Sequence, residues 1–228
     1  MSLVLHSHPL SSYCHKVLIA LYENGTAFTA EMVNFGDPAA KAAYAELWPT
    51  AKIPLLQDTA RGQIVPETSI MIEYLDRHYP GARPLLPADA AACQDARLWD
   101  RLSDLYVMNA MARIVDDRMR PAAERDPRAV RDAHATLTTA YGMIDRNMAK
   151  KTWAAGADFT IADCALAPAL FYAGIVFPFP ETHKHLVAYF ERLLQRTSVA
   201  RVIAEARPFF EYFPFKDAMP RRFLEGAA

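Results

Sequence analysis

A serine pair near the N-terminus could do chemistry on a sulfur atom. Ser11 and Ser12 lie where a short apolar strand pattern, residues 3–5, gives way to a helical pattern that begins at Tyr13. The amides of a helix N-terminus are unpaired, and the helix dipole favours negative charge beside them. A thiolate held there would be stabilised, and a serine hydroxyl could add one hydrogen bond to it. Simple helix capping by the two serines is the alternative interpretation.

A second chemical motif lies at residues 67–69, where Glu67, Thr68 and Ser69 open another helical pattern. A hydroxyl and free amides at a helix N-terminus bind a carboxylate, while the carboxylate of Glu67 could pair with an ammonium group. The motif therefore predicts a site for a group that carries both charges. Taken alone, Glu67 could also be a first-turn glutamate that the helix dipole favours.

Residues 11–17 resemble the active-site turn of serine-type glutathione transferases, such as the zeta and tau classes. In those proteins a serine lies five residues before a basic residue that precedes a valine, and Ser11 and Lys16 fit this spacing. The segment also resembles the redox turn of glutaredoxins, with Ser11 in place of the nucleophilic cysteine and Cys14 at the second cysteine position. Ser12 stands where many relatives have proline, which is a departure from the pattern.

Two further segments follow in the order of that family. Residues 51–55 resemble its segment with a cis proline, so Pro54 is expected to be cis and to present the backbone of Ile53 to the cysteinyl part of glutathione. Lys52 matches a position that reaches the glycyl carboxylate. Glu67 and Thr68 resemble the Glu-Ser motif that binds the γ-glutamyl group, with Thr68 in place of serine. Standing alone, residues 51–55 would indicate an ordinary trans proline.

The resemblance implies a bacterial member of the cytosolic glutathione S-transferase family, active in detoxification, in which Ser11 donates a hydrogen bond to the thiol of bound glutathione. That thiol titrates near about 8.5 when free, and lowering its pKa by roughly two units requires on the order of 2.7 kcal/mol. One charge-assisted hydrogen bond supplies about 1.5–3 kcal/mol. Glutathione is the expected co-substrate, and no metal is expected. The expected glutathione-binding residues are Ser11, Ser12, Lys52, Ile53, Pro54, Glu67 and Thr68.

The order of local patterns predicts the elements that position these motifs. Strand patterns at residues 3–5, 28–33, 54–57 and 63–65 alternate with helical patterns that start at Tyr13, Ala39 and Glu67. The order β-α-β-α-β-β-α predicts a small α/β domain with a mixed sheet, which the resemblance identifies as thioredoxin-like. The expected domains are residues 1–80 for glutathione binding, a linker at 81–88, and an all-helical domain at 89–228.

The second domain is expected to supply the pocket for a small hydrophobic electrophile, with Tyr106, Met108 and Met111 as candidate walls. Plain core packing is the alternative for these three residues, because they recur at helical spacing. Helical patterns cover residues 90–119, 127–148, 161–172, 183–196 and 199–206. Thr160 and Asp163 predict a capping box, and Pro168 a bend in the helix that follows. The aromatic tail at 208–215 is expected to pack over the domain or to roof the pocket.

Composition limits the classes of function. The chain has 228 residues, 52% of them hydrophobic and 22% charged, and a net charge of −1 without a block of like charge, which argues against nucleic-acid binding. No apolar run approaches the roughly 20 residues that cross a bilayer, and the N-terminus lacks the pattern of a signal peptide. Three scattered cysteines, Cys14, Cys93 and Cys164, indicate a reducing compartment. We expect a soluble cytoplasmic protein.

Partners and rival functions follow from the resemblance. A homodimer is implied, with an interface around residues 65–78 and 90–119. A disulfide reductase or peroxidase would need a reactive thiol, and Cys14 is expected to be an inert, partly buried one, with His15 solvated on the helix. A zeta-like isomerase would use Ser11, but Tyr13 stands at the zeta cysteine position. The non-enzymatic alternative is a binding or regulatory module on the same fold.

Overall fold

The N-terminal part of the protein is built on a small mixed sheet. The computed structural model describes residues 2–225. The strands, in the order β2-β1-β3-β4 across the sheet, are β1 (Leu3–Ser7), β2 (Thr29–Met32), β3 (Leu55–Asp58) and β4 (Gln63–Val65). β1 pairs parallel with β2 and antiparallel with β3, and β3 pairs antiparallel with β4. This is the mixed sheet that the sequence predicts.

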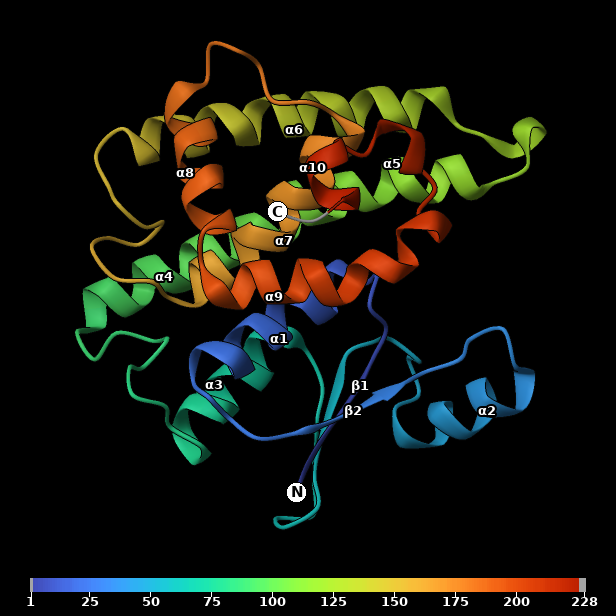
Figure 1. Ribbon diagram of the computed structural model, residues 1–228, viewed down its shortest axis with the longest axis vertical. Helices are drawn as coiled ribbons and strands as arrows, with labels where there is room; N and C mark the ends of the chain where they lie inside the picture. The colour runs from blue at the N-terminus through green and yellow to red at the C-terminus, as the bar shows by residue number, and fades with distance from the viewer. Residues whose placement is uncertain (1, 226–228) are drawn as a thin grey trace.

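Three helices accompany the sheet: α1 (Ser12–Glu23), α2 (Pro38–Leu47) and α3 (Thr68–His78). α1 packs against α3 on one side and against α7 and α9 of the helical part on the other. It is therefore buried along most of its length and lies between the sheet and the helices in Figure 1. α2 stands apart at the margin of the molecule, with Tyr44 as its one buried residue.

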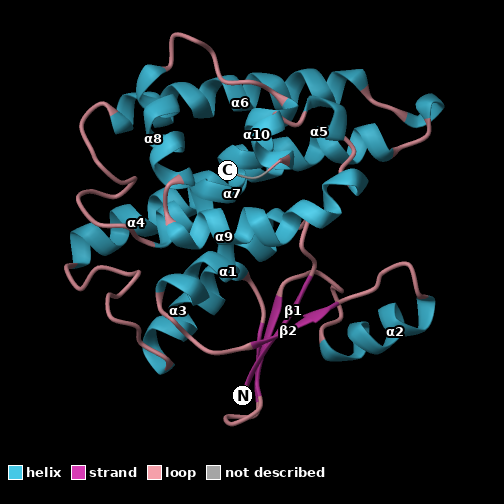
Figure 2. Cartoon of the chain, viewed as in Figure 1, coloured by secondary structure: helices cyan, strands magenta, loops and turns pink. Residues whose placement is uncertain are grey.

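The rest of the described chain is helical. Residues 79–225 contain no strand, only an isolated bridge between Trp153 and Gly156, and Figure 2 shows strands confined to the first part. The long helices are α4 (Ala90–Leu102), α5 (Asn109–Met119), α6 (Pro127–Met148), α7 (Ile161–Val176), α8 (Lys184–Leu194) and α9 (Thr197–Ala206). The short ones are η2 (Ala122–Glu124), η3 (Arg207–Tyr212), η4 (Lys216–Ala218) and α10 (Arg221–Leu224). The predicted fold class, a thioredoxin-like part followed by helices, is confirmed.

The predicted helix over residues 90–119 contains a change of winding. α4 passes into a π-helical segment, η1 (Ser103–Met108), and then into α5 without a break. A π segment has more residues per turn than an α-helix and is often found at functional sites. The faces of this run consequently cannot be assigned from a regular 3.6-residue period.

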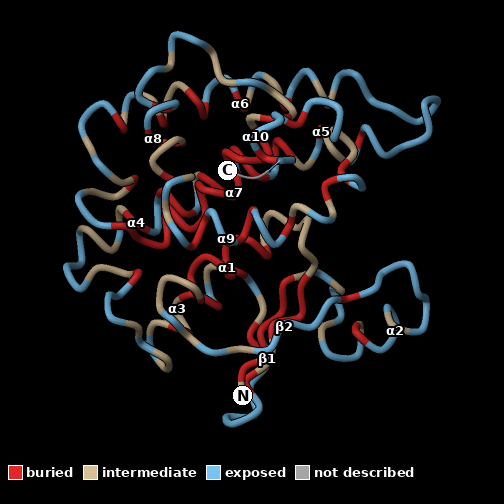
Figure 3. The backbone as a smooth tube through the Cα atoms, in the orientation of Figure 1, coloured by how far each residue is buried: buried red, intermediate tan, exposed pale blue. Residues whose placement is uncertain are grey.

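α7 is the centre of the core. Nearly all of its residues are buried, as the red tube in Figure 3 shows, because helices pack around it on all sides. It begins with the predicted capping box of Thr160 and Asp163. The Asp163 carboxylate also accepts hydrogen bonds from the Tyr189 hydroxyl at 2.6 Å and the Ala154 amide at 2.9 Å. Pro168 stands inside the helix.

The aromatic tail packs onto α7. The Phe210 ring stacks on Phe171, and the Phe213 ring lies against Tyr172. Phe209 approaches the ring of His8 near the first helix, with 5.9 Å between centroids. The tail thus closes one side of the core. The domain limits at 80 and 89 stay a prediction, although α3 ends at His78 and α4 begins at Ala90.

Candidate functional site

A cleft of about 400 Å³ separates the α/β part from the α4–η1–α5 run. Its α/β wall consists of Tyr13, Trp48, Lys52, Ile53, Pro54, Glu67 and Thr68. Its helical wall consists of Arg101, Asp104, Leu105 and Asn109. The fold therefore brings five of the seven predicted glutathione-binding residues to one cavity. Ser11 and Ser12 are not in its lining, but Tyr13, which directly follows them, is.

The loop before β3 is shaped by its backbone. The Ile53–Pro54 peptide bond is cis, as the resemblance implies, and Ala51 has a left-handed φ of 50°. The Tyr44 hydroxyl donates a hydrogen bond to the carbonyl of Lys52 at 2.8 Å and holds the loop against α2. The backbone next to the cis bond is thus fixed at the cleft, while the Lys52 side chain is exposed.

The N-terminus of α3 lacks a capping side chain. Glu67 occupies the N-cap position at φ 65° and ψ 119° and makes no side-chain capping hydrogen bond, whereas Ser11, Asp37 and Asp89 cap their helices. A left-handed φ is uncommon for a residue with a side chain, and such strain gathers at ligand sites. The first amides of α3 and the hydroxyl of Thr68 are therefore available to bind an anion, and the Glu67 carboxylate belongs to the adjacent residue.

The turn that carries Ser11 and Ser12, here called the serine turn, is held by hydrogen bonds. The Ser11 hydroxyl oxygen accepts a hydrogen bond from the Cys14 amide at 3.3 Å, and the Ser11 amide donates to the carbonyl of His8 at 3.0 Å. The capping interpretation of Ser11 is therefore realised. Accepting a bond leaves the hydroxyl proton of Ser11 for another acceptor. Ser11 and Ser12 are both half-buried beside the cleft residue Tyr13.

His15 is buried rather than solvated, contrary to the sequence prediction. Its Nε2 lies 2.5 Å from the carbonyl of Pro9, and its ring packs against Tyr172 at 5.4 Å between centroids. Burial lowers the pKa of His15 to about 4, so the ring is neutral near pH 7 and donates to that carbonyl. Its face of α1 points into the helical part, which the local pattern alone does not reveal.

Cys14 is fully buried, more so than predicted. Burial raises the pKa of its thiol to about 11, although the hydrogen bond with Ser11 opposes the rise. Thiolates are the reactive form, so this environment suits an inert thiol.

Lys16 on α1 connects the α/β part to the α4–η1 run beneath the cleft surface. Its side chain is fully buried, and its Nζ lies 2.5 Å from Asp100 Oδ1 and 2.8 Å from Asp104 Oδ2. It also donates to the hydroxyl of Ser69 on α3 at 3.0 Å. Burial, reinforced by Asp100 and opposed by Lys16, raises the pKa of Asp104. The sequence alone does not predict this network, and its one local signal is the spacing of Asp100 and Asp104, four residues apart on a predicted helix.

Tyr13 crosses the cleft. Its hydroxyl donates a hydrogen bond to Asn109 Oδ1 at 3.0 Å and so joins α1 to the first residue of α5. Burial and the nearby charge of Asp104 raise the pKa of Tyr13, so its phenol stays protonated near pH 7. Sequence reasoning treated Tyr13 as a substituted cysteine position and did not place it in the site.

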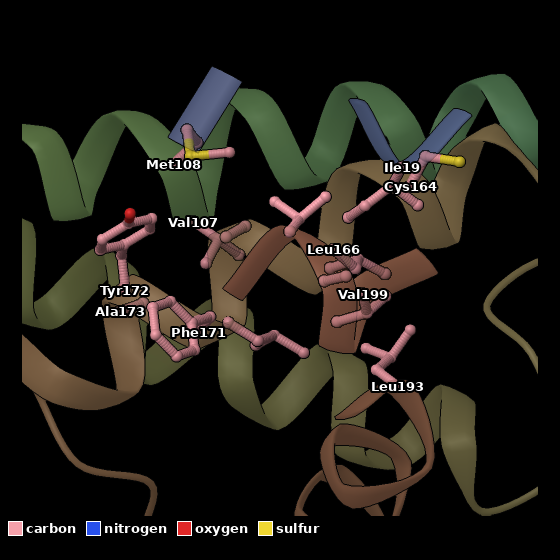
Figure 4. Close-up of a cluster of buried hydrophobic side chains, with 14 of the residues drawn as sticks. Ile19, Val107, Met108, Cys164, Leu166, Phe171, Tyr172, Ala173, Leu193 and Val199 are labelled. Atoms are coloured by element: carbon pink, nitrogen blue, oxygen red, sulfur yellow. The ribbon is translucent and has the colours of Figure 1, made fainter. Parts of the chain in front are cut away.

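The predicted electrophile walls do not lie in this cleft. Met108 and Met111 are 0% and 4% exposed and belong to the core, where Figure 4 shows Met108 beside Val107. Tyr106 is 49% exposed and borders a separate small cavity. The helical run turns a different face to the cleft, on which Arg101, Leu105 and Asn109 follow one another at intervals of four residues.

Within residues 2–225, no three His, Cys, Asp or Glu side chains are grouped so as to hold a metal ion. In the same part of the chain, no helix has the length and apolar character to cross a membrane.

Comparisons with known proteins cover most of the chain. The family model "Glutathione S-transferase, N-terminal domain" matches residues 5–83, and "Glutathione S-transferase, C-terminal domain" matches residues 103–197. A glutathione S-transferase of Pseudomonas putida is 30% identical, with 71% of this chain and 70% of that protein covered. A stringent starvation protein A homolog of Coxiella burnetii is 29% identical, with 90% and 92% covered.

Among solved structures, a glutathione S-transferase from Methylobacterium radiotolerans in complex with glutathione sulfonate is 28% identical to this chain. It superposes with a TM-score of 0.77, with 88% of this chain and 93% of that one covered.

Proposed function

Because this chain belongs to the glutathione S-transferase family, we propose that it binds glutathione in the cleft and activates its thiol for attack on an electrophile. One observation carries the proposal. The cleft combines the cis Ile53–Pro54 bond, Lys52, and the uncapped N-terminus of α3 with Glu67 and Thr68. The cleft thus offers the backbone of Ile53 to a peptide, with the opposite charges of Lys52 and Glu67 for the two ends of that peptide.

In the proposed pose, the tripeptide lies extended along the α/β wall. The γ-glutamyl carboxylate meets the first amides of α3 and the hydroxyl of Thr68, and its ammonium group pairs with Glu67. The cysteinyl residue pairs with the backbone of Ile53, and the glycyl carboxylate reaches the exposed Lys52. The related Methylobacterium radiotolerans protein, solved with glutathione sulfonate, supports this choice of ligand.

The sulfur then lies at the N-terminus of α1, where Ser11 donates to it. The Ser11 hydroxyl accepts the amide of Cys14 and keeps its own proton, so it serves as a donor without ionising. We accordingly propose that the chain is a serine-type member of the family. Cys14, buried and with a raised pKa, is a poor nucleophile, which weighs against a disulfide reductase or peroxidase.

A calorimetric titration tests glutathione binding first. Wild-type protein is expected to bind glutathione, and Glu67→Gln is expected to weaken binding by roughly 1.5–3 kcal/mol, because a charge-assisted bond is lost. Glu46→Gln, at an exposed position on α2, is the matched control. Absence of binding to the wild-type protein would overturn the proposed function.

We also propose a homodimer formed through α3 and the α4–η1 run. Ile70, Leu98 and Tyr106 on these elements are each about half exposed, at 54%, 52% and 49%. Exposed large apolar side chains are typical of surfaces that associate. Light scattering is expected to give a dimer mass, and Ile70→Glu is expected to yield monomers. The three free cysteines support a cytoplasmic location.

A binding or regulatory module is the second candidate. The stringent starvation protein A homolog of Coxiella burnetii matches 90% of this chain, more than the Pseudomonas putida transferase does. Tight glutathione binding without turnover of any electrophile in a broad panel would favour the module. Conjugation well above the uncatalysed rate would favour the transferase.

A further inference from the structure

The turn between α5 and α6 projects from the body of the molecule, as Figure 1 shows. Residues 118–128, here called the α5–α6 arm, cover the end of α5, the short helix η2 and the start of α6. All of them are exposed, and this part of the tube is pale blue in Figure 3. Arg118 follows the cleft residue Asn109 by nine positions, which corresponds to about 14 Å along an α-helix. The arm therefore lies apart from the proposed glutathione site.

The α5–α6 arm is positively charged. Two of its residues are acidic, Glu124 and Asp126, whereas four are arginines, namely Arg118, Arg120, Arg125 and Arg128. Four arginines against two carboxylates leave the arm with a net charge of +2, in a chain whose net charge is −1. Among the ion pairs within residues 2–225, none involves any of these four arginines. Their charges are therefore available to a partner.

Hydrogen bonds give the arm a defined shape. Nη2 of Arg125 donates to the carbonyl of Arg118 at 3.2 Å, and its Nε donates to the carbonyl of Arg120 at 3.4 Å. The buried Asp117 carboxylate accepts the amide of Asp126 at 2.6 Å, and Asp126 caps α6. A surface that is already formed loses little conformational freedom when a partner binds.

Arg120 and Arg128 come from opposite sides of the arm and act on the same carboxylate. Asp126 accepts the amides of Ala129 at 3.1 Å and Arg128 at 2.9 Å. These bonds, together with the charges of Arg120 and Arg128, hold the pKa of Asp126 below its usual range. Because Asp126 is engaged with the backbone of α6, the two guanidinium groups remain free for carboxylates of another molecule, which they can bind in a bidentate manner.

Met119 places an apolar side chain between two of these arginines. It is 62% exposed and lies between Arg118 and Arg120 in the sequence. Methionine and arginine are both enriched where proteins bind one another, and arginine is frequent among the residues that dominate the affinity. Nucleic acids instead require a larger positive charge than that of this arm. The combination therefore favours a protein partner.

We propose that the α5–α6 arm is a docking surface for a protein segment that carries several carboxylates around an apolar side chain. The carboxylates pair with Arg120 and Arg128, and the apolar side chain packs against Met119. This activity goes beyond the proposed function and does not require bound glutathione. Because the arginines are exposed, added salt should weaken the contact.

Fluorescence anisotropy tests the proposal on the full-length protein at low salt. The probe is a labelled acidic peptide in which pairs of glutamates alternate with single leucines, and the wild-type protein is expected to bind it saturably. Arg120→Glu combined with Arg128→Glu is expected to weaken binding by at least about tenfold, because two attractive charges become repulsive. The matched control combines Arg83→Glu with Arg221→Glu, at exposed positions outside the arm, and should weaken binding by less than about twofold.

Met119→Ser separates the apolar contact from the effect of charge. This variant is expected to weaken binding of the leucine peptide by at least about threefold. A second peptide, with glycine at the leucine positions, should bind equally to the variant and to the wild-type protein. Equal binding of the leucine peptide to both proteins would overturn the role of Met119.

Three results would overturn the docking surface itself. The first is the absence of saturable peptide binding to the wild-type protein. The second is an equal loss of binding in the two double variants, since the arm would then be no better than other exposed arginines. The third is tighter binding of a single-stranded oligonucleotide of the same charge, which would identify a nucleic-acid surface instead.

Discussion

The two walls of the cleft are built in different ways. The α/β wall relies on backbone features, namely the cis Ile53–Pro54 bond and the uncapped start of α3 at Glu67. The helical wall presents side chains, such as Arg101 and Asn109, from a run that contains a π segment. Backbone geometry is set by the fold and changes little when side chains change. On the proposed function, the first wall binds glutathione, and the second wall faces the compound that glutathione attacks.

The largest expected effect comes from the buried cation that supports both walls. Lys16→Met removes the buried cation whose Nζ lies 2.5 Å from Asp100 and 2.8 Å from Asp104. Asp100 would lose its ion-pair partner and Asp104 would keep only the half-exposed Arg101, and breaking a buried pair costs about 3–5 kcal/mol. Urea denaturation is expected to show this loss.

Lys41→Met, at an exposed position on α2, is the control for the Lys16 variant and should change the free energy of unfolding by less than about 0.5 kcal/mol. A loss in Lys16→Met no larger than in this control would mean that the network does not hold the two walls together.

Acid should destabilise the serine turn at the start of α1 through His15. The folded-state pKa of His15 is lowered to about 4 from 6.5, so the unfolded chain binds a proton first as pH falls. The stabilisation from the neutral ring is fully present above about pH 6.5 and is lost between there and about pH 4, by roughly 3 kcal/mol. Unfolding measured across this range is expected to be less pH-dependent in His15→Gln.

His185→Gln, at an exposed histidine, should retain the pH dependence of the wild-type protein. An unchanged pH profile in His15→Gln would contradict the assignment of this acid sensitivity to the serine turn.

Substitutions of Glu67 on the α/β wall should affect protein stability and glutathione binding in different directions. Its φ of 65° is one that glycine adopts without steric cost. Glu67→Gly is expected to raise the free energy of unfolding by on the order of 1 kcal/mol while weakening glutathione binding. Thermal unfolding and calorimetry measure the two effects. Glu67→Gln should weaken glutathione binding without raising the free energy of unfolding. A Glu67→Gly variant that lost stability as well as binding would show that the left-handed backbone of Glu67 is not strained.

The sequence predicts the α/β wall well because its signals are local. The strands, the helix start at Glu67 and the cis Pro54 follow from short motifs and their resemblance to the family. α6 also begins and ends as predicted, at Pro127 and Met148, since Asp126 caps it and a proline follows the cap.

The helical wall could not be predicted in the same way. Lys16 and Asp104 meet across 88 residues, and no local pattern reports such a contact. The sequence offers Tyr106, Met108 and Met111 either as pocket walls or as core residues, and the π segment and the packing of α7 place Met108 and Met111 in the core. The burial of His15 likewise depends on Tyr172 from a distant helix.

In the proposed function, the N-terminus of α1, with Ser11, lowers the pKa of the glutathione thiol. The ultraviolet difference spectrum of bound thiolate, titrated against pH on the wild-type protein and on Ser11→Ala, tests it directly. We predict a thiol pKa about two units below the free value of about 8.5 in the wild-type complex, and a rise of about 1–2 units in Ser11→Ala with glutathione affinity retained. An unshifted pKa in the wild-type complex, or one that Ser11→Ala leaves unchanged, would contradict this role of Ser11.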